Sequence, residues 1–450
     1  MGRLRKGPSV LGVRYMSAKN YNNLFLGSIM MSLAVLITCQ GAQARGAEKS
    51  TFELRKPQYF YVGLDYSPAF SNIRDFTIQE SSGETKAIYP YISEEREILL
   101  KANRFDWNMP NPRIGFKNSM LVAAGNSIGY AMGGMRLEIE VSHQHFKSQG
   151  RYIGNKKEEE SDTIYLLAKE LGHSAVTEKT EDLISALTKV KGEDIVRFAN
   201  ALEKDHPDIS KKICRTRSIP GGKNYGKYNT YTSWFKDTNN LTALCGDIGG
   251  SSDKLEDYNM IQNSFKDFAR ETLVGESTNW PTTTGDNVQG NDNAKALAHE
   301  LITLLSREEK ITVAGLMANT IEGGEVVDIG AISSTSVMVN VCYDFLSKEV
   351  SIVPYGCMGL GSNFVGIVKG HLTPKPAYRV KAGVSYRFTS GIDIFAAGFY
   401  HRVFGSTEYT DIPVEYLIDD VSPYGRTKET AMANFRMSYA GGEFGMRFAF

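Results

Sequence analysis

The 450-residue chain lacks several features that mark common classes of protein. Lys and Arg together number 51, as do Asp and Glu, so the net charge is zero and a general nucleic-acid-binding role is not expected. Beyond the N-terminal region no segment has a run of about 20 apolar residues, so no membrane-spanning helix is expected. The sequence also contains no internal repeat and no low-complexity tract.

Catalytic and metal-binding patterns are missing as well. No Ser-His-Asp elbow and no convincing Asp/His pairing occurs in the sequence. His143 and His145 are two residues apart on a predicted strand and therefore share a face. No Cys or carboxylate cluster completes a site with them, so we interpret both as ordinary residues at the rim of a sheet. We expect no enzymatic activity, no metal and no cofactor.

The N-terminus indicates export from the cytoplasm. Leu24 to Thr38 is an apolar run of signal-peptide length, and Ala42-Gln43-Ala44 is a cleavage motif of the A-x-A kind. We predict that residues 1–44 are a signal peptide and that the mature chain begins at Arg45. Met16 is an alternative start.

Cysteine is scarce, and four of the five cysteines follow the predicted cleavage point. Their spacing matches no zinc-binding pattern, and an even number in an exported protein permits disulfides. We predict a disulfide between Cys214 and Cys245, which enclose a loop of about 30 residues. Cys342 and Cys357 lie on neighbouring predicted strands, where pairing depends on a Cβ separation that the sequence does not supply.

The last stretch of the chain is typical of a strand that closes an outer-membrane barrel. Apolar side chains recur at every second position from Phe435 to Tyr439, and again in the last seven residues, with small or charged residues between them. The phase changes between these two runs, where Gly441 and Gly442 would allow a bulge. We predict that the apolar stripe at the end of this strand faces lipid. Its members are Phe444, Met446, Phe448 and Phe450.

Similar alternation elsewhere predicts about eight antiparallel strands, an even number typical of outer-membrane barrels. The connections after the second, fourth and sixth strands are short and the others are longer, as expected for periplasmic turns and external loops. Residues 123–127 are predicted to form the turn after the second strand. The predicted strands are residues 59–70, 113–122, 135–142, 336–345, 352–365, 378–388, 392–404 and 435–450.

The third connection is far longer than a hairpin loop and lacks the strand pattern. Apolar residues there fall at helical spacing. We predict an all-β membrane β-barrel with a large, mainly helical external insert at residues 147–333, between N-terminal barrel strands at 45–146 and C-terminal barrel strands at 334–450. The predicted helices are residues 158–171, 181–190, 193–202, 255–273 and 293–306.

Two flanks and a set of central motifs are distinctive. The flanks are Tyr61 to Pro68 and Val337 to Phe450, and the central motifs are Cys214, Cys245, Trp280-Pro281 and Ala294-Lys295-Ala296. Together they resemble the variable major surface antigens of tick-transmitted, obligate intracellular, rickettsia-like bacteria. The resemblance covers essentially the whole mature chain. It implies antigenic variation by exchange of the central segment, and porin or host-adhesion roles.

Charged residues alternate with the apolar ones on the predicted strands and would face the interior of the barrel. Two interpretations stay open: a pore lining with a cationic bias, or a salt-bridge network that packs a narrow lumen. Eight strands leave an interior barely wide enough for side chains, which favours the network. The predicted interior set is Glu138, Glu140, Arg379, Lys381, Arg387, Arg436 and Arg447.

Three functions follow from this sequence: a surface antigen with a variable central segment, a porin for small hydrophilic solutes, and an adhesin that binds host cells. The expected location is the bacterial outer membrane, with the insert exposed at the cell surface. The expected partners are outer-membrane lipid, the outer-membrane assembly machinery and host antibodies, with a host-cell receptor and a homo-oligomer as further alternatives.

Overall fold

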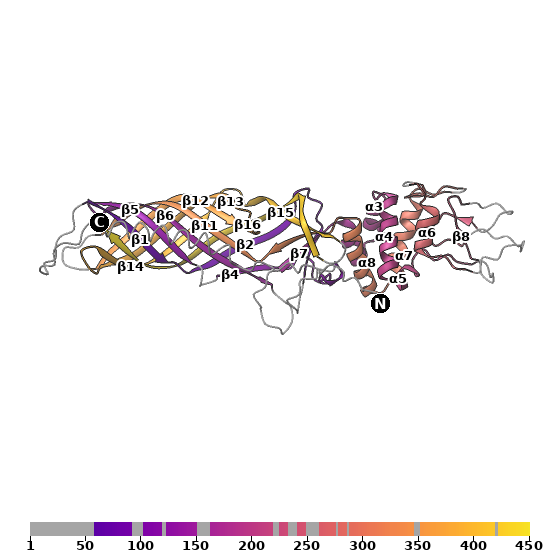
Figure 1. Ribbon diagram of the computed structural model, residues 1–450, viewed down its shortest axis with the longest axis horizontal. Coiled ribbons are helices and arrows are strands. Elements are labelled where there is room, and N and C mark those ends of the chain that lie inside the picture. Colours follow the sequence, from indigo (N-terminus) through magenta and orange to yellow (C-terminus); the bar gives the residue numbers. More distant parts are fainter. Residues whose placement is uncertain are drawn as a thin grey trace, which may run out of the picture.

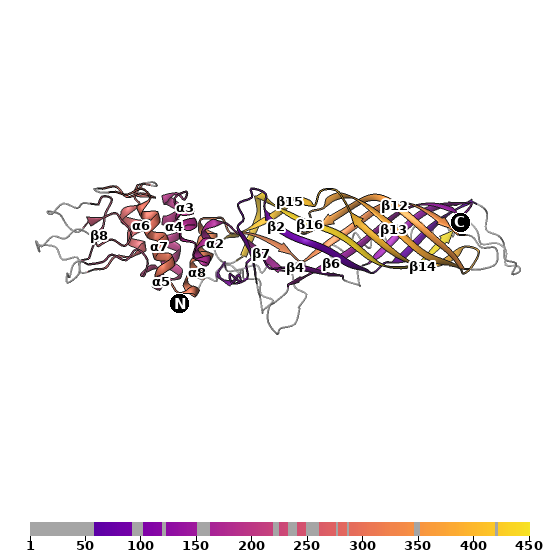
Figure 2. The same cartoon turned by 180° about the vertical axis from the view of Figure 1, so that it is seen from behind.

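The computed structural model describes residues 58–91, 102–118, 123–150, 163–218, 225–232, 241–248, 261–275, 278–285, 288–345, 352–418 and 422–450. The predicted signal peptide lies outside these residues. The molecule is elongated, with strands at one end and helices at the other (Figures 1 and 2). Across the described stretches, no helix is long and apolar enough to cross a membrane.

Eight antiparallel strands pair in a cycle, so that the sheet closes on itself. The cycle is completed where the last strand pairs with the first, from Tyr61 opposite Ala449 to Tyr66 opposite Phe444. Such a closed sheet has no unpaired edge. In cyclic order the strands are β1 (Gln58–Tyr66), β5 (Ala124–Met132), β6 (Met135–Gly150), β11 (Ala331–Asp344), β12 (Ile352–Gly366), β13 (Thr373–Arg387), β14 (Ile392–Val403) and β16 (Ser422–Ala449).

Further strands lengthen the closed sheet toward the helices. β2 and β1 pair with successive segments of one edge of β16, and β15 and β14 pair with successive segments of its other edge. In the same way, β4 and β5 pair with successive segments of one edge of β6. A short branch of three strands then continues from β15. These elements are β2 (Ala69–Glu80), β4 (Ile114–Asn118), β15 (Glu408–Ile418), β10 (Glu325–Ile329), β7 (Thr163–Ala168) and β3 (Ala87–Pro90).

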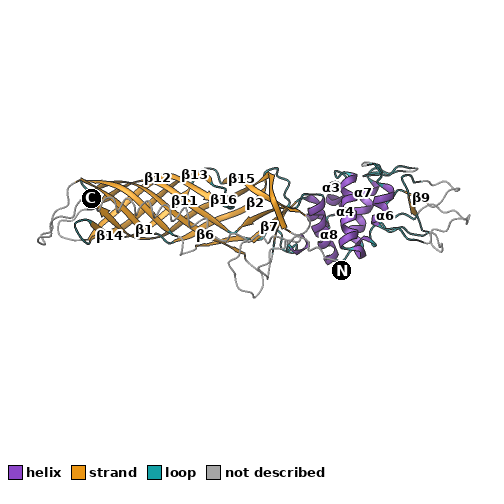
Figure 3. Ribbon diagram, in the orientation of Figure 1, coloured by secondary structure: helices purple, strands orange, loops and turns teal. Residues whose placement is uncertain are grey.

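The helices form a bundle around one apolar core, to which strands β3, β7, β10 and β15 also contribute side chains (Figure 3). Leu183, Phe198 and Leu297 are fully buried there, and Cys214 is joined to Cys245 by a disulfide within the same core. The elements are η1 (Ala102–Arg104), α2 (Glu170–Thr177), α3 (Thr180–Leu187), α4 (Gly192–Asp205), α5 (Pro207–Ser210), β8 (Lys227–Tyr228), β9 (Leu241–Thr242), α6 (Phe265–Thr272), α7 (Asp292–Thr303) and α8 (Arg307–Thr320).

The central insert is less helical than predicted. The predicted helix at 158–171 is wrong, because strand β7 occupies Thr163–Ala168 and pairs with β10 and β3. Neighbours cover both faces of β7, and a short continuous apolar run of this kind does not distinguish a strand from a buried helix. The sheet also passes the predicted limits of the insert, since β6 continues to Gly150 and β11 begins at Ala331.

The second strand of the closed sheet is not where the alternation placed it. The prediction of a strand at 113–122 and a turn at 123–127 is wrong: β5 begins at Ala124, and only the short β4 lies in the earlier segment. The inward positions of β5 are small residues, which hides the period of two. A Cβ at Gly129 would lie 2.3 Å from Cζ of Tyr61, so glycine makes room for that ring.

The predicted alternation of loop lengths fails at one connection. The fifth connection of the closed sheet is expected to be long but spans only residues 367–372. It is therefore a short turn, like the sixth connection at 388–391. Strand β13 begins earlier than predicted, and Pro374 and Pro376 lie at its outward positions. Proline is tolerated where the strand reaches the rim of a sheet.

The predicted bulge at Gly441 and Gly442 is absent from this described part of β16. β16 pairs with β14 across these glycines without a register shift. Odd-numbered residues therefore face inward on both sides of them, including Phe435, which is 1% exposed, and Arg447, which is 5% exposed. The change along β16 is chemical: apolar residues face inward near the helices and outward near the C-terminus.

The same change divides the whole closed sheet into two zones. Near the C-terminus the outward side chains are large and apolar, such as Leu137 and Val341, which are 54% and 49% exposed. Nearer to the helices the apolar side chains point inward, and Phe146 and Tyr439 pack there in one buried cluster. We call the first zone the apolar band.

Carboxylates gather around Lys169 where the sheet meets the helices. Lys169 Nζ lies 3.5 Å from Glu80 Oε1, 3.7 Å from Glu325 Oε2 and 3.4 Å from Glu84 Oε2. Glu80 and Glu325 are 1% and 2% exposed. Burial, and then the adjacent Glu80 carboxyl, raises the pKa of Glu325 to about 7.

We expect the free energy of unfolding to fall as pH rises from 4.5, the ordinary pKa of Glu325, to about 7. In this window the unfolded carboxyl has lost its proton while the folded one retains it, so folding becomes less favourable. Glu325→Gln should flatten the profile and raise stability above pH 7 by about 1 to 3 kcal/mol. Thermal unfolding in detergent at a series of pH values, monitored by the helical circular-dichroism signal, measures this change in stability.

Glu84→Gln is the matched control, because Glu84 belongs to the same cluster but its side chain is 63% exposed. This variant should leave the profile unchanged. Part of the slope should persist in Glu325→Gln, since burial also raises the pKa of Glu322 to about 7. A Glu325→Gln profile that coincides with that of the original chain would contradict the assignment.

Candidate functional site

The interior of the apolar band holds a cluster of charged side chains and one amide, which we call the interior network. Each member occupies an inward position of its strand because successive side chains of a strand point to opposite faces. All are at most 5% exposed. They are Arg136, Glu138 and Glu140 of β6, Asn340 of β11, Arg379 and Lys381 of β13, and Glu443 and Arg447 of β16.

Lys381 is the centre of the network. Its ammonium group contacts Glu140 and lies 3.0 Å from Glu443 Oε2 and 3.6 Å from Glu138 Oε1. Asn340 Nδ2 donates hydrogen bonds to Glu138 Oε1 at 3.0 Å and to Glu140 Oε2 at 2.7 Å. One cation thus holds three carboxylates from two strands that are distant in the sequence.

Arg379 lies next to this centre on the side of the apolar cluster. Its guanidinium group contacts Glu140 and donates to Ser142 Oγ at 2.8 Å. Its Nε donates to Nδ1 of His401 at 3.3 Å, and the His401 ring stacks on Tyr439 with 4.5 Å between centroids. Charged and apolar interiors therefore meet at His401.

Aromatic rings enclose the arginines on the other side of Lys381. The guanidinium of Arg447 lies 4.1 Å from the ring centroid of Phe395 and 4.8 Å from that of Tyr355. Arg136 lies 4.9 Å from the Tyr355 centroid and 3.0 Å from Asp344 Oδ1. Such cation–π contacts stabilise arginines that are removed from water.

Five of the seven predicted interior residues meet in this network, and two do not. Arg436 is exposed and pairs with the exposed Asp75 at the surface, so its prediction as an interior residue is wrong. It occupies an even, outward position of β16. Arg387 keeps an inward position at the end of β13, where its side chain is 34% exposed and lies 3.9 Å from Asp393.

Sequence reasoning missed four members of the interior: Arg136, Asn340, His401 and Glu443. The first three alternate with apolar residues on predicted strands and could have been assigned by parity. Glu443 stands between the two apolar runs of β16, where a bulge was expected. Only the continuous register of β16 with β14 places it inside.

The four cysteines form two disulfides. Cys342 and Cys357 are directly opposite on β11 and β12 and are bonded inside the closed sheet, beside Glu138. The Cys214–Cys245 bond lies beside Glu300. These are the two groups of described residues that could by geometry hold a metal. Metal binding requires thiolates, so the bonded sulfurs do not provide such sites.

The central motifs hold the helical bundle together. Trp280 is 5% exposed, and its Nε1 donates to the carbonyl of Val190 at 3.1 Å. The carbonyl of Pro281 accepts from the backbone N–H of Ala294 at 3.2 Å. Lys295 Nζ donates to the Gly290 carbonyl at 2.9 Å, and Ala296 packs against the core. These residues therefore serve packing and turn formation.

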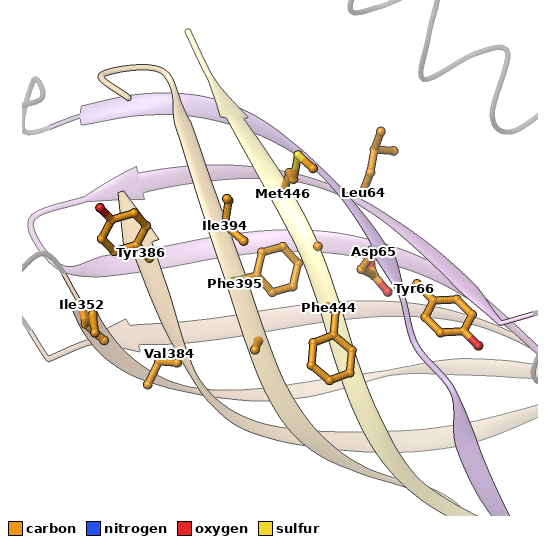
Figure 4. Close-up of a pocket in the computed structure, with 12 residues that line it drawn as sticks. Leu64, Asp65, Tyr66, Ile352, Val384, Tyr386, Ile394, Phe395, Phe444 and Met446 are labelled. Carbon is orange, nitrogen blue, oxygen red and sulfur yellow. The ribbon is translucent and has the colours of Figure 1, made fainter. Parts of the chain in front are cut away.

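The outward face beside the predicted closing strand carries an apolar groove (Figure 4). Close approach of β1 and β16 forms its floor: a Cβ at Gly445 would lie 2.2 Å from the Leu64 carbonyl oxygen. Two exposed members of the predicted stripe, Phe444 and Met446, line it. Other lining side chains are Leu64, Val384, Tyr386 and Ile394.

The arrangement as a whole fills the interior with mutually paired groups. Cations and carboxylates alternate around Lys381 and Arg379. Truncating one member would leave its partners charged and buried, which is costly. Chemically, the network is suited to holding the strands together and to occupying the lumen.

Comparisons with known proteins identify relatives of this chain. The surface antigen family matches residues 55–206 and 208–450. Major surface antigen 4 of Anaplasma marginale is 42% identical over 125 residues, which are 28% of this chain and 42% of that protein. The chain thus matches less than half the length of this curated relative.

Two solved structures are also similar. Neisserial surface protein A and the outer membrane protease OmpT from Escherichia coli each have 8% identity and a TM-score of 0.24, with 88% and 89% of this chain and 100% of each structure covered. A TM-score this low carries no weight for the fold. The closed sheet rests on the strand pairing of the chain itself.

Proposed function

This chain belongs to the surface antigen family and is related to an antigen of a tick-transmitted, rickettsia-like bacterium, and from this we propose that it is an outer-membrane β-barrel that displays its helical bundle at the cell surface. The closed sheet would span the membrane. The bundle would lie outside the cell. Display of an antigen, without catalysis, would be its function.

The apolar band is the observation that carries this proposal. A barrel in water places apolar side chains inside and polar ones outside, whereas a membrane barrel reverses the two. In the band, Ile139 and Val339 are 56% and 49% exposed, while Glu140 and Asn340 beside them in sequence are fully buried. Hydrocarbon is the environment that suits this inverted arrangement.

The positions of the first and last strands support the proposed orientation. The Phe60 carbonyl of β1 accepts from the N–H of Phe450, so β1 begins beside the C-terminus, at the end of the closed sheet that is away from the helices (Figure 1). An exported chain that follows a signal peptide would have this end in the periplasm. The two-residue turn at Gly133 and Gly134 lies at the same end, as periplasmic turns of such barrels do.

The interior network favours display over passive diffusion. Lys381, Arg379 and their carboxylate partners occupy the lumen, and the apolar cluster that includes Phe435 fills it nearer to the helices. A porin of eight strands would need a passage through both the interior network and the apolar cluster. We therefore place the porin hypothesis second to antigen display.

Antigenic variation is compatible with the distribution of buried and exposed residues in the helical bundle. The residues that hold the bundle together are buried: Cys214, Cys245, Trp280 and Ala294 are at most 5% exposed. Exposed positions of the same helices contribute little to the core and would tolerate exchange, since surface substitutions usually change stability by less than about 0.5 kcal/mol. Host antibodies would contact those exposed positions.

Limited proteolysis of intact cells tests the topology. We expect cleavage within residues 150–330 and protection of the connections near Lys348, which lies outside the described residues, and Ser390, because the helical bundle would face the medium and both connections the periplasm. Mass spectrometry of the released peptides identifies the sites. Permeabilised cells provide the control, in which both turns should become accessible. Cleavage at either turn in intact cells would refute the orientation.

A further inference from the structure

The disulfide between Cys342 and Cys357 lies in the interior of the closed sheet, where both cysteines are shielded from solvent. Cys342 is fully buried and Cys357 is 5% exposed. The two residues are directly opposite each other on β11 and β12, and both occupy inward positions. A reagent that acts on this bond must therefore reach sulfur atoms that the closed sheet covers.

The interior network surrounds the disulfide within its own row of residues. In the strand register, Arg136 of β6 is opposite Cys342, and Lys381 of β13 is opposite Cys357. Both cations are at most 4% exposed. A carboxylate oxygen of Glu138 lies within 4.8 Å of both sulfur atoms. Charged side chains that are paired with one another therefore leave little room beside the bond.

Aromatic side chains cover the disulfide toward the end of the sheet that holds the C-terminus. Tyr355 lies two residues before Cys357 on the same face of β12, and Tyr355 and Phe395 pack with both cysteines in one buried cluster. The guanidinium of Arg447 contacts both rings, 4.8 Å from the Tyr355 centroid and 4.1 Å from the Phe395 centroid. Access from this end would require these groups to separate.

Disulfide formation by exchange requires direct contact between an oxidant and a sulfur atom. One cysteine thiolate attacks the oxidant's disulfide, which gives a mixed disulfide and releases one oxidant thiol. The second cysteine thiolate then attacks the sulfur of the first and releases the other oxidant thiol. Two electrons pass to the oxidant, and the two cysteine protons end on the released thiols. The mixed disulfide would place the oxidant covalently inside the lumen, which side chains already occupy.

The two cysteines belong to a part of the sheet that can form early. They are 15 residues apart on consecutive strands. In contrast, the whole helical bundle separates β6 from β11, and β16 meets β1 from the opposite end of the chain. Closing a short loop costs less entropy than closing a long one. The hairpin of β11 and β12 can therefore bring both thiols together while they are still accessible.

The disulfide also fixes a register that the apolar pattern leaves open. The outward positions of β11 include Val337, Val339 and Val341, so a shift of two residues against β12 would keep the same faces outward. A disulfide requires the two Cβ atoms to be close, which holds when Cys342 is directly opposite Cys357. Once the bond has formed, it excludes the shifted pairings before the other strands join.

We propose that the Cys342–Cys357 disulfide is made before the sheet closes, by exchange between the open β11–β12 hairpin and an oxidant that itself carries a disulfide. Closure of the sheet then shields the bond from reduction and further exchange. The oxidation is thus a step that precedes assembly of the barrel. It is independent of antigen display, because it depends on strand pairing and burial alone.

The test refolds the full chain without its predicted signal peptide in detergent, starting from the denatured and reduced state. Oxidised glutathione is added either at the start of refolding or after closure under reducing conditions and removal of the reductant. Heat-modifiable gel mobility scores closure, and alkylation followed by peptide mass spectrometry scores each cysteine pair. This experiment does not depend on membrane orientation, so the proposed function can fail without affecting its outcome.

Oxidant present from the start should give folded chain with the Cys342–Cys357 bond. Oxidant added after closure should form this bond on the order of 100-fold more slowly, because the sulfur atoms become accessible only when the sheet opens locally. A pair that oxidises equally fast in the closed and the open chain would overturn the proposal.

A matched variant shows that the reagents are active on the closed chain. Leu304→Cys adds a thiol at a position of the helical bundle that is 49% exposed. In the reduced and closed variant, N-ethylmaleimide should label this thiol and leave Cys342 and Cys357 unlabelled. Labelling of all three at the same rate would show that the closed sheet does not shield the interior pair.

Pulse–chase labelling in cells that express the chain follows the order of events directly, even if the reduced chain does not close in detergent. Chains are alkylated at successive times, and the closed ones are recognised by their gel mobility. Every closed chain should already carry the Cys342–Cys357 bond. Closed chains in which both thiols are free, at any time of the chase, would contradict oxidation before closure.

Discussion

Lys381→Met should destabilise the closed sheet by about 3 to 5 kcal/mol, the usual cost of removing one partner from a buried ionic cluster. Methionine has a similar length but no charge, so it leaves Glu138, Glu140 and Glu443 facing one another in the interior without their common cation. Denaturant titration of the refolded protein in detergent, scored by heat-modifiable gel mobility, measures the loss.

Two variants make the result specific to the interior network. Arg387→Met removes a cation from the same strand, but that side chain is 34% exposed and weakly paired, so it should cost less than about 1 kcal/mol. Adding Glu443→Gln to Lys381→Met removes a carboxylate that has lost its ion pair with Lys381 and should recover part of the loss, whereas Glu140 stays paired with Arg379. Equal stability of Lys381→Met and the original chain would show that these groups are not buried together.

The conductance of the original chain distinguishes a filled lumen from a pore. The original chain should give no steady current in a planar bilayer, because paired side chains and the apolar cluster occupy its interior. A stable conductance with cation or anion selectivity in the original chain would favour the porin hypothesis. The network would then be a selectivity element.

How much the sequence predicts depends on whether a strand keeps one environment along its length. Strands β6, β11 and β13 each alternate large apolar residues with polar ones through the apolar band, so their existence and facing follow from period two alone. β16 leaves one environment for another, and its outward face changes from apolar residues near the C-terminus to charged ones nearer to the helices. Apolar character alone therefore assigns Arg436 to the wrong face.

Two outward regions of β16 show why the apolar pattern assigns Arg436 to the wrong face. Phe444 and Met446 point outward within the apolar band. Arg436 is outward too, but it lies beyond the band, where the exposed face of the sheet is polar and Asp75 is its partner. In the proposed placement, β16 would cross from lipid to water and so exchange the chemistry of its two faces without changing its parity. No local sequence signal separates that exchange from a bulge.

The partners within the interior network were beyond prediction for a different reason. Alternation shows that Lys381 and Glu140 face inward, but their contact depends on the stagger of strands that are distant in the sequence. The prediction of the second strand is wrong for a related reason. Gly125 and Gly129 of β5 leave space for side chains of β1, so the neighbouring strand fills the interior there and β5 shows no alternation of its own. Packing of this kind is a property of strand pairs.

Deleting Phe448 to Phe450 should greatly reduce the fraction of chain that folds into the outer membrane. The deletion removes the pairs of Phe448 with Val62 and with Ile392, on the two sides of β16. It also removes the hydrogen bonds from Ala449 N to the Gly391 carbonyl at 2.7 Å and from Phe450 N to the Phe60 carbonyl at 3.0 Å. Hydrocarbon offers no replacement partner for the carbonyls left behind.

Point variants at the C-terminus separate anchoring from pairing. Phe450 is 60% exposed, so Phe450→Ala keeps the backbone pairs and should lower assembly yield more than the stability of assembled protein. Phe450→Asp should lower the yield further, because it places a charge at the lipid boundary. Leu304→Asp is the matched control: Leu304 is 49% exposed in the helical bundle, and the charge should be tolerated there. Membrane fractionation followed by heat-modifiable gel mobility measures each yield. A truncated chain that reaches the outer membrane and folds at the original yield would refute the role of β16 as the closing strand, and with it the proposed membrane barrel.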